Sequence, residues 1–153
     1  MREPVTTVVG IDPGGTTGVA TLMYYRDSGW LVVPRQYGQA NALTETLDLL
    51  SRANPDAVAV ERFIVSNRSA RSRSSGAGEF ARELIGALQY TGCPLDRRTA
   101  SQVKRWATDK RLSAAGLLEP TKGMPHARDA TRHALFSMVH RKWAPDPLSR
   151  AEV

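Results

Sequence analysis

Apolar residues cluster in short runs in the first 61 positions and recur at helical spacing further along the chain. Residues 5–11 are β-branched and nearly continuous, which predicts a strand buried on both faces. Residues 18–24 and 30–33 predict two further strands. The turns between the three segments are short, so we expect antiparallel hairpins.

A helix is predicted after Asn41, a suitable N-cap, and it should end before Pro55. Residues 57–61 then form a short apolar run that reads as a buried strand. A strand, a helix and a strand in this order favour a crossover connection, which places the second strand parallel to an earlier one. The apolar positions of the helix recur at its period: Leu43, Leu47 and Leu50.

The second half of the chain is mainly helical by its pattern. An amphipathic helix is predicted from about residue 79 to 90, followed by a short strand at 95–98. Ser101 is a suitable cap for the next helix. Pro125 suits the first turn of a last helix that runs to about Lys142.

Two segments lack any such pattern. Residues 64–78 are small, polar and basic, and they cannot bury enough apolar surface to order themselves. They are either a solvated surface loop or a flexible arm that becomes ordered on a phosphate backbone. Residues 144–153 form a non-helical, mobile tail. No linker divides the rest, so residues 1–143 are predicted to be one domain.

The net charge of the chain narrows the range of possible functions. The 153 residues include 21 Lys+Arg against 15 Asp+Glu, a net charge of +6, and the pI is about 10.0. Such a balance is typical of proteins that bind nucleic acid. A single cysteine and the absence of a signal-peptide core favour a reducing cytoplasm. No apolar run approaches the length needed to span a bilayer, so no membrane partner is expected.

Candidate chemistry is concentrated in acidic and imidazole side chains. Asp12 and Glu61 each end an apolar run, and His126 and Asp129 lie one helical turn apart. Carboxylates are preferred by Mg²⁺ and Mn²⁺, and two such ions about 3.5–4 Å apart can drive phosphodiester hydrolysis. Asp12 fits the position between two ions, and His126 or Asp129 can hold the second. Taken singly, each of these residues is also an ordinary turn or helix-end residue.

These residues and their order resemble RuvC-type Holliday junction resolvases of the RNase H-like superfamily, the phage-encoded members most of all. The resemblance runs from about Val5 to Arg141. Its signatures are residues 10–14, Val60-Glu61, residues 102–104 and residues 126–130.

The resemblance implies an α/β fold with a five-stranded mixed sheet, three strands antiparallel, flanked by helices. It also implies a homodimer that cuts four-way DNA junctions with two Mg²⁺ or Mn²⁺ ions, in DNA recombination and repair. For a phage-encoded member, the compartment is the bacterial host cytoplasm. The catalytic and metal-binding residues would be Asp12, Glu61, His126 and Asp129, with Lys104 contacting phosphate.

The chain departs from the family pattern in two places. The glycine-rich stretch after the lysine is replaced by residues 106–111, so Lys110 or Lys122 would have to take the place of a second family lysine. Phe63 stands two residues after Glu61, where the family has an aromatic residue three after its glutamate.

DNA contacts are expected on both sides of the candidate site. Arg68, Arg71 and Arg73 could neutralise phosphates along one path. Phe63 is either a residue that stacks on an unpaired base or a core aromatic. The basic end of the last helix reads mostly as a solvated face, although Arg132 or His133 could reach toward the metal site.

Three other functions compete with junction cleavage. An RNase H-like nuclease could act on RNA or flaps, and a non-catalytic DNA-binding module could keep the same fold. The third alternative is a phosphotransferase or ATPase, because residues 12–17 resemble the phosphate loop of actin-like and sugar-kinase folds. Those proteins need a second domain and a longer chain to enclose a nucleotide.

Overall fold

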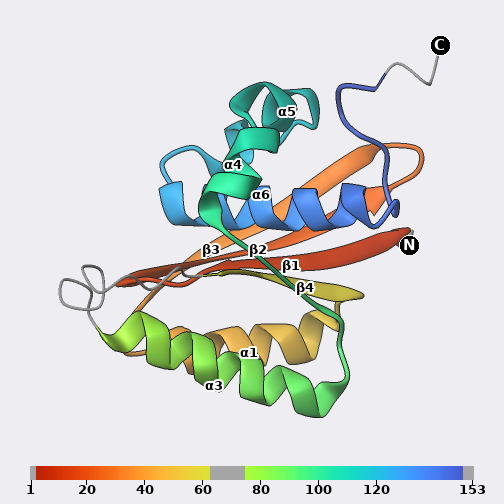
Figure 1. The fold of residues 1–153 in the computed structure, drawn as a ribbon. Helices are drawn as coiled ribbons and strands as arrows, with labels where there is room; N and C mark the ends of the chain where they lie inside the picture. The colour runs from red at the N-terminus through yellow and green to blue at the C-terminus, as the bar shows by residue number, and fades with distance from the viewer. Residues whose placement is uncertain (1–2, 63–74, 150–153) are drawn as a thin grey trace.

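The chain folds into three layers, with one sheet between two layers of helices (Figure 1). The structure is a computed structural model and describes residues 3–62 and 75–149. Helix α6, with α4 and α5 above it, covers one face of the sheet, and α1 and α3 cover the other. Within these residues, none of the helices is both long and apolar enough to cross a membrane.

The sheet has five strands in the order β3-β2-β1-β4-β5. Strands β1, β2 and β3 are antiparallel, whereas β4 runs parallel to β1 and β5 runs parallel to β4. The predicted mixed sheet, with three antiparallel strands and a parallel crossover, is therefore confirmed. The strands are β1 (Thr6–Asp12), β2 (Thr16–Tyr25), β3 (Gly29–Gly38), β4 (Ala57–Glu61) and β5 (Leu95–Arg98).

Two helix starts differ from the prediction. Helix α3 begins at Ser75, so the basic segment predicted at 64–78 ends earlier than expected. Thr99, not Ser101, caps α4, because its hydroxyl accepts the Gln102 N–H at 3.2 Å while the Gln102 side chain accepts the Thr99 N–H at 3.2 Å. The helices are α1 (Ala42–Ala53), α3 (Ser75–Thr91), α4 (Ala100–Trp106), α5 (Asp109–Ala114), the 3-10 turn η1 (Glu119–Thr121) and α6 (Pro125–His140).

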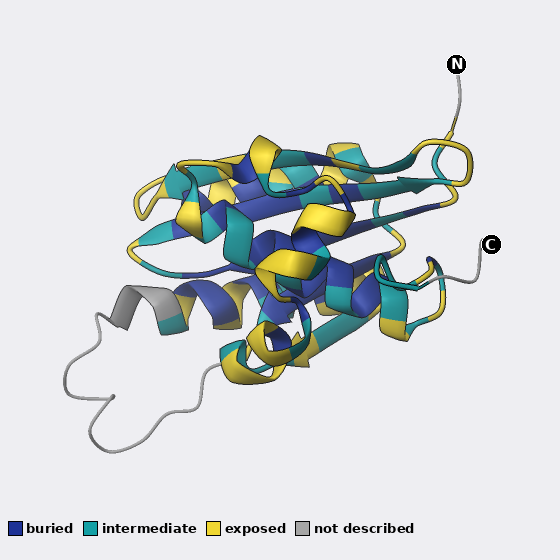
Figure 2. Ribbon diagram, turned by 90° about the horizontal axis from the view of Figure 1, so that it is seen from above, coloured by how far each residue is buried: buried dark blue, intermediate teal, exposed yellow. Residues whose placement is uncertain are grey.

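The alternation of side chains along β1 divides the core into two clusters. Val9 and Ile11 pack with α1 and α3, and Val8 packs on the opposite side with α6. Both faces of the central strands are buried, as Figure 2 shows. This explains why residues 5–11 read as an uninterrupted apolar run.

Helix α6 lies unusually close to the sheet. A Cβ atom at Gly10 would overlap the carbonyl oxygen of Ala130, and one at Gly18 would overlap the backbone of His126. On α6 itself, Ala127, Ala130 and Ala134 are fully buried. Small residues on both surfaces therefore bring the two backbones into contact.

Residues 144–149, predicted to be mobile, instead pack against the helical layer. Ala144 is buried, and the Asp146 carboxylate accepts two hydrogen bonds from Arg111, at 3.0 and 2.8 Å. Strand β3 forms an edge of the sheet and contains Pro34.

Gly10→Ala should lower the free energy of unfolding by about 1–3 kcal/mol or more, because the added methyl overlaps backbone that cannot move aside locally. Chemical denaturation measures the loss. Gly86→Ala is the matched control: it lies inside α3 with nothing within 4 Å of its Cβ position. It should be neutral or stabilising by up to about 1 kcal/mol. Equal stability of the two variants would contradict the close contact.

Candidate active site

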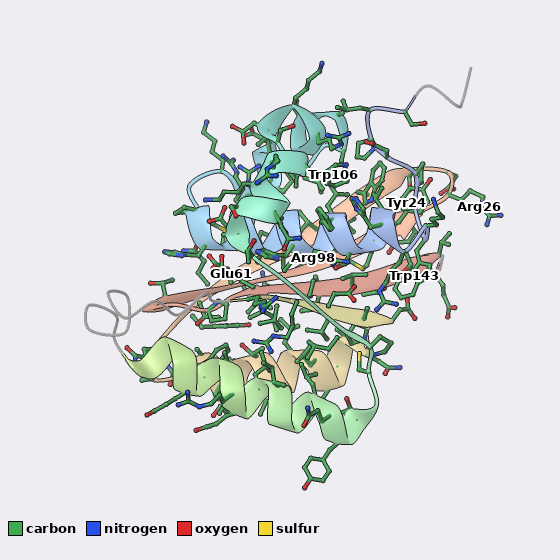
Figure 3. The ribbon with its side chains drawn as sticks, in the orientation of Figure 1. Tyr24, Arg26, Glu61, Arg98, Trp106 and Trp143 are labelled. Atoms are coloured by element: carbon green, nitrogen blue, oxygen red, sulfur yellow. The ribbon has the colours of Figure 1, made fainter. Side chains whose placement is uncertain are left out.

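Asp12 and Glu61 end two neighbouring parallel strands. Ile11 of β1 pairs with Val60 of β4, so the two acidic residues follow at the same level of the sheet. Side chains alternate along a strand, and Gly10 and Ala59 face α6. Asp12 and Glu61 therefore face α6 as well. Figure 3 shows Glu61 between the sheet and α6, at the end of the sheet opposite to Tyr24, Arg26 and Trp143.

The first turn of α6 carries His126 and Asp129 to this end of the sheet. His126 Nδ1 lies 3.4 Å from Asp12 Oδ2. The turn has no side-chain cap of its own, because its N-cap residue is Met124. Instead, Gln36 on β3 places its side-chain oxygen 3.0 Å from the His126 N–H and 3.2 Å from the Ala127 N–H. The carboxamide thus fixes where the helix begins relative to the sheet.

Two cations lie against the Asp129 carboxylate. Lys104 Nζ is 3.6 Å from one carboxylate oxygen, and Arg132 Nε is 3.5 Å from the other. Lys104 comes from α4. Together these groups line one small cleft, formed by Glu61, Ala100, Val103, Lys104, Asp129, Arg132 and His133.

The basic end of α6 was predicted to be mostly a solvated face from which Arg132 or His133 could reach toward the candidate site, and both of these side chains do face it. The side chain of Arg132 is only 12% exposed, and His133 is buried. Both face the cleft because they lie three and four residues after Asp129, on the same side of the helix.

His133 is neutral at physiological pH. Burial, and then the charges of Arg98 and Lys104, lower the pKa of its imidazole to about 4. Its Nε2 lies 3.9 Å from Glu61 Oε1, too far for a direct hydrogen bond. The imidazole therefore places a polar but uncharged group beside the Glu61 carboxylate.

Asp12 is held in a position that disfavours its charge. Burial first, and then the nearby Asp129, raise the pKa of its carboxyl to about 7, while Lys104 acts in the opposite direction. A carboxylate buried beside a second carboxylate is stabilised by any cation that reaches both. The electrostatics around Asp12 thus favour a bound cation.

The donor types fit a divalent metal. Two ligands in neighbouring positions on an octahedral ion at 2.0–2.1 Å lie about 3 Å apart, near the separation of Asp12 and His126. Within residues 3–62 and 75–149, no three acidic, histidine or cysteine side chains converge into a complete ligand set. Among these residues the four predicted ligands therefore do not form one set: His126 lies beside Asp12, whereas Glu61 and Asp129 line the cleft, with Lys104 and Arg132 against Asp129.

The remaining predicted residues lie elsewhere. Lys110 is exposed on α5, and Lys122 is exposed at the end of η1. Neither lines the cleft. Four predicted DNA contacts fall outside the described residues: Phe63, Arg68, Arg71 and Arg73.

Asp12→Asn should raise thermal stability in EDTA at pH 8. The folded carboxyl keeps its proton up to about pH 7 whereas the unfolded one loses it near 3.8, so stability falls as pH rises between these values. At pH 8 the amide variant escapes this cost, which is at most about 4 kcal/mol. Calorimetry from pH 4 to 8 should show the difference in Tm vanish toward pH 4. A variant less stable than wild type at pH 8 would contradict the assignment.

No protein-family model matches the sequence, and no curated protein sequence matches it either. Solved structures do match. Thermus thermophilus RuvC in complex with a Holliday junction substrate has a TM-score of 0.69 at 22% identity, over 90% of this chain and 95% of that one. The Fowlpox virus resolvase, crystallised with Holliday junction DNA, has a TM-score of 0.57 at 14% identity, over 88% of this chain and 98% of that one.

The yeast mitochondrial Holliday junction resolvase is a more distant match. Its TM-score is 0.50 at 13% identity, over 95% of this chain and 72% of that one. All these identities are low, so the matches establish a shared fold. The chain has the RNase H-like fold of RuvC and other Holliday junction resolvases.

Proposed function

We propose that the protein is a metal-dependent endonuclease that cuts branched DNA, four-way junctions in particular. One observation carries the proposal: Asp12 and Glu61 end adjacent strands beneath the helix turn that bears His126 and Asp129. Two structurally similar proteins, whose structures were solved in complex with Holliday junction DNA, support the choice of substrate. The basic balance of the chain agrees with a polyanionic partner.

The residues divide the work between metal and phosphate. Asp12, Glu61, His126 and Asp129 would hold two Mg²⁺ or Mn²⁺ ions, with Asp12 between them. When bound, the ions supply a nucleophilic water at neutral pH and stabilise charge on the phosphate and the leaving oxygen. Lys104 lies at the mouth of the cleft with a side chain that is 58% exposed, so it can turn from Asp129 to a phosphate oxygen.

Cutting a four-way junction symmetrically requires two sites. A single chain carries one copy each of Asp12, Glu61, His126 and Asp129, and thus one candidate site of this kind. We therefore propose a homodimer, each copy cutting one strand. Lys110, Lys122 and the basic segment with Arg68, Arg71 and Arg73 would contact phosphates of the arms, and Phe63 a base near the cut.

The electrostatics argue against a non-catalytic DNA-binding module. Burying an ionised Asp12 costs stability, and this cost has no evident use in a protein that binds DNA without cutting it. A nuclease acting on RNA or flaps would need the same cleft. Substrate comparison separates that alternative from junction cleavage.

Purified protein should nick a four-way junction only with added Mg²⁺ or Mn²⁺, because the carboxylates need an ion to activate water. Asp12→Asn should keep junction binding and lose cutting by several orders of magnitude. A gel with four-way, flap, fork, linear duplex and RNA–DNA substrates measures both effects. Cutting that persists in EDTA would contradict the metal mechanism. A preference for the flap or the RNA–DNA hybrid would favour the alternative, a nuclease that acts on flaps or RNA.

Changing Arg68, Arg71 and Arg73 together to alanine should weaken junction binding and flatten its salt dependence. Each phosphate contact contributes about 0.9 to the slope of log K against log salt, so the slope should fall by roughly 2–3. Arg26→Ala is the control, because Arg26 lies at the opposite end of the sheet from Glu61. An unchanged slope in the triple variant would favour the other interpretation of this segment, a solvated surface loop that does not contact DNA.

A further inference from the structure

Arg132 is tied to the protein at both ends of its guanidinium group. One terminal nitrogen donates to the Ala107 carbonyl at 2.6 Å, and the other donates to Asp109 Oδ1 at 2.6 Å. Ala107 ends α4, and Asp109 begins α5. The side chain therefore joins the α4–α5 turn to α6.

The third nitrogen of the same group, Nε, lies beside Asp129. Arg132 Nε is buried and, within the described part of the chain, has no hydrogen-bond partner. It lies 3.5 Å from Asp129 Oδ1, just beyond hydrogen-bond length. A buried donor without a partner is costly, so its position is set by the two anchors and not by its own contact.

Lys104 cannot do the same for Asp129. Its ammonium group lies 3.6 Å from Asp129 Oδ2, and its side chain is largely exposed. A flexible exposed lysine pairs weakly. Of the two cations beside Asp129, only Arg132 is fixed in place.

We propose that Arg132 is a positioning residue: its anchored guanidinium holds the Asp129 carboxylate in the orientation that binds a divalent ion. The inference rests on the proposed function, since it takes Asp129 as a metal ligand. Partners that orient metal ligands typically change metal affinity by 10–100-fold when they are removed.

The sign of the effect separates positioning from simple electrostatics. A positive charge beside a metal site repels the ion, so electrostatics alone predict tighter binding in Arg132→Gln and unchanged binding in Arg132→Lys. Positioning predicts weaker binding in both variants, because neither side chain keeps the planar fork that spans Ala107 and Asp109.

Arg111 provides a matched control. It donates to the carbonyl of Trp106, next to Ala107, at 2.9 Å, and it forms a bidentate pair with Asp146. Its side chain is 21% exposed, similar to that of Arg132. Arg111→Gln should thus loosen the same turn without touching Asp129.

The experiment measures Mn²⁺ binding to the DNA-free protein, from the electron paramagnetic resonance signal of free Mn²⁺. We expect Arg132→Gln and Arg132→Lys to lose about 10-fold or more in affinity. Arg111→Gln should bind as wild type does, even where its melting temperature falls as far. Asp129→Asn is the reference for a lost ligand. Asp109→Asn, a change at a largely exposed anchor, should weaken binding by less than about fivefold.

Each other outcome overturns the inference. Unchanged or tighter binding in Arg132→Gln, normal binding in Arg132→Lys, or equal weakening in Arg111→Gln would each do so. If the Arg132 variants fail to fold, unchanged affinity in Asp109→Asn would decide against it. A wild-type protein that binds no Mn²⁺ would instead remove the proposed metal mechanism itself, whereas weakening in Asp129→Asn alone would leave that mechanism standing.

Discussion

The contact between α6 and the sheet determines the geometry of the whole candidate site. Gly10 and Gly18 leave no room for a side chain, and the α6 backbone occupies that space. His126 reaches Asp12 only because the backbone at His126 rests directly on Gly18. Gln36, whose strand neighbour in β2 is Gly18, fixes the first turn of the helix at the same place. The chemistry of the site thus depends on two positions that contribute no side chain to it.

The same packing brings together ionisable groups whose charges are costly to bury side by side. Asp12 is buried where its charge is unfavourable, and Asp129 stands close enough to add to that cost. Lys104 offsets part of this cost, Arg132 lies against Asp129, and His133 stays neutral. Functional sites commonly retain such local instability, which the rest of the fold compensates. Here the compensation comes from two well-buried clusters on either face of the sheet.

The sequence was informative wherever a local pattern determines structure. The five strands and the last helix follow from alternation and spacing, and Asp12, Glu61, His126 and Asp129 were recognisable because each stands at an element's end. The contacts that the sequence did not reveal are long-range ones between a side chain and a distant backbone. Gln36 caps a helix 90 residues away, and Arg132 reaches Ala107 across the α4–α5 turn. No periodicity encodes such pairs. The environment of His133 likewise depends on distant segments, because Arg98 of β5 and Lys104 of α4 both act on its imidazole.

The edge strand β3 has a consequence for how copies of this protein can meet. Pro34 lies in the middle of its ten residues and lacks an N–H, and Arg35 beside it is exposed. Proline and charge on an edge discourage another strand from docking there. The opposite edge, β5, is only four residues long. Pairing of one molecule's sheet with the next is therefore disfavoured at both edges. Two copies would then meet through helical surfaces, and edge-to-edge aggregation at high protein concentration is disfavoured as well.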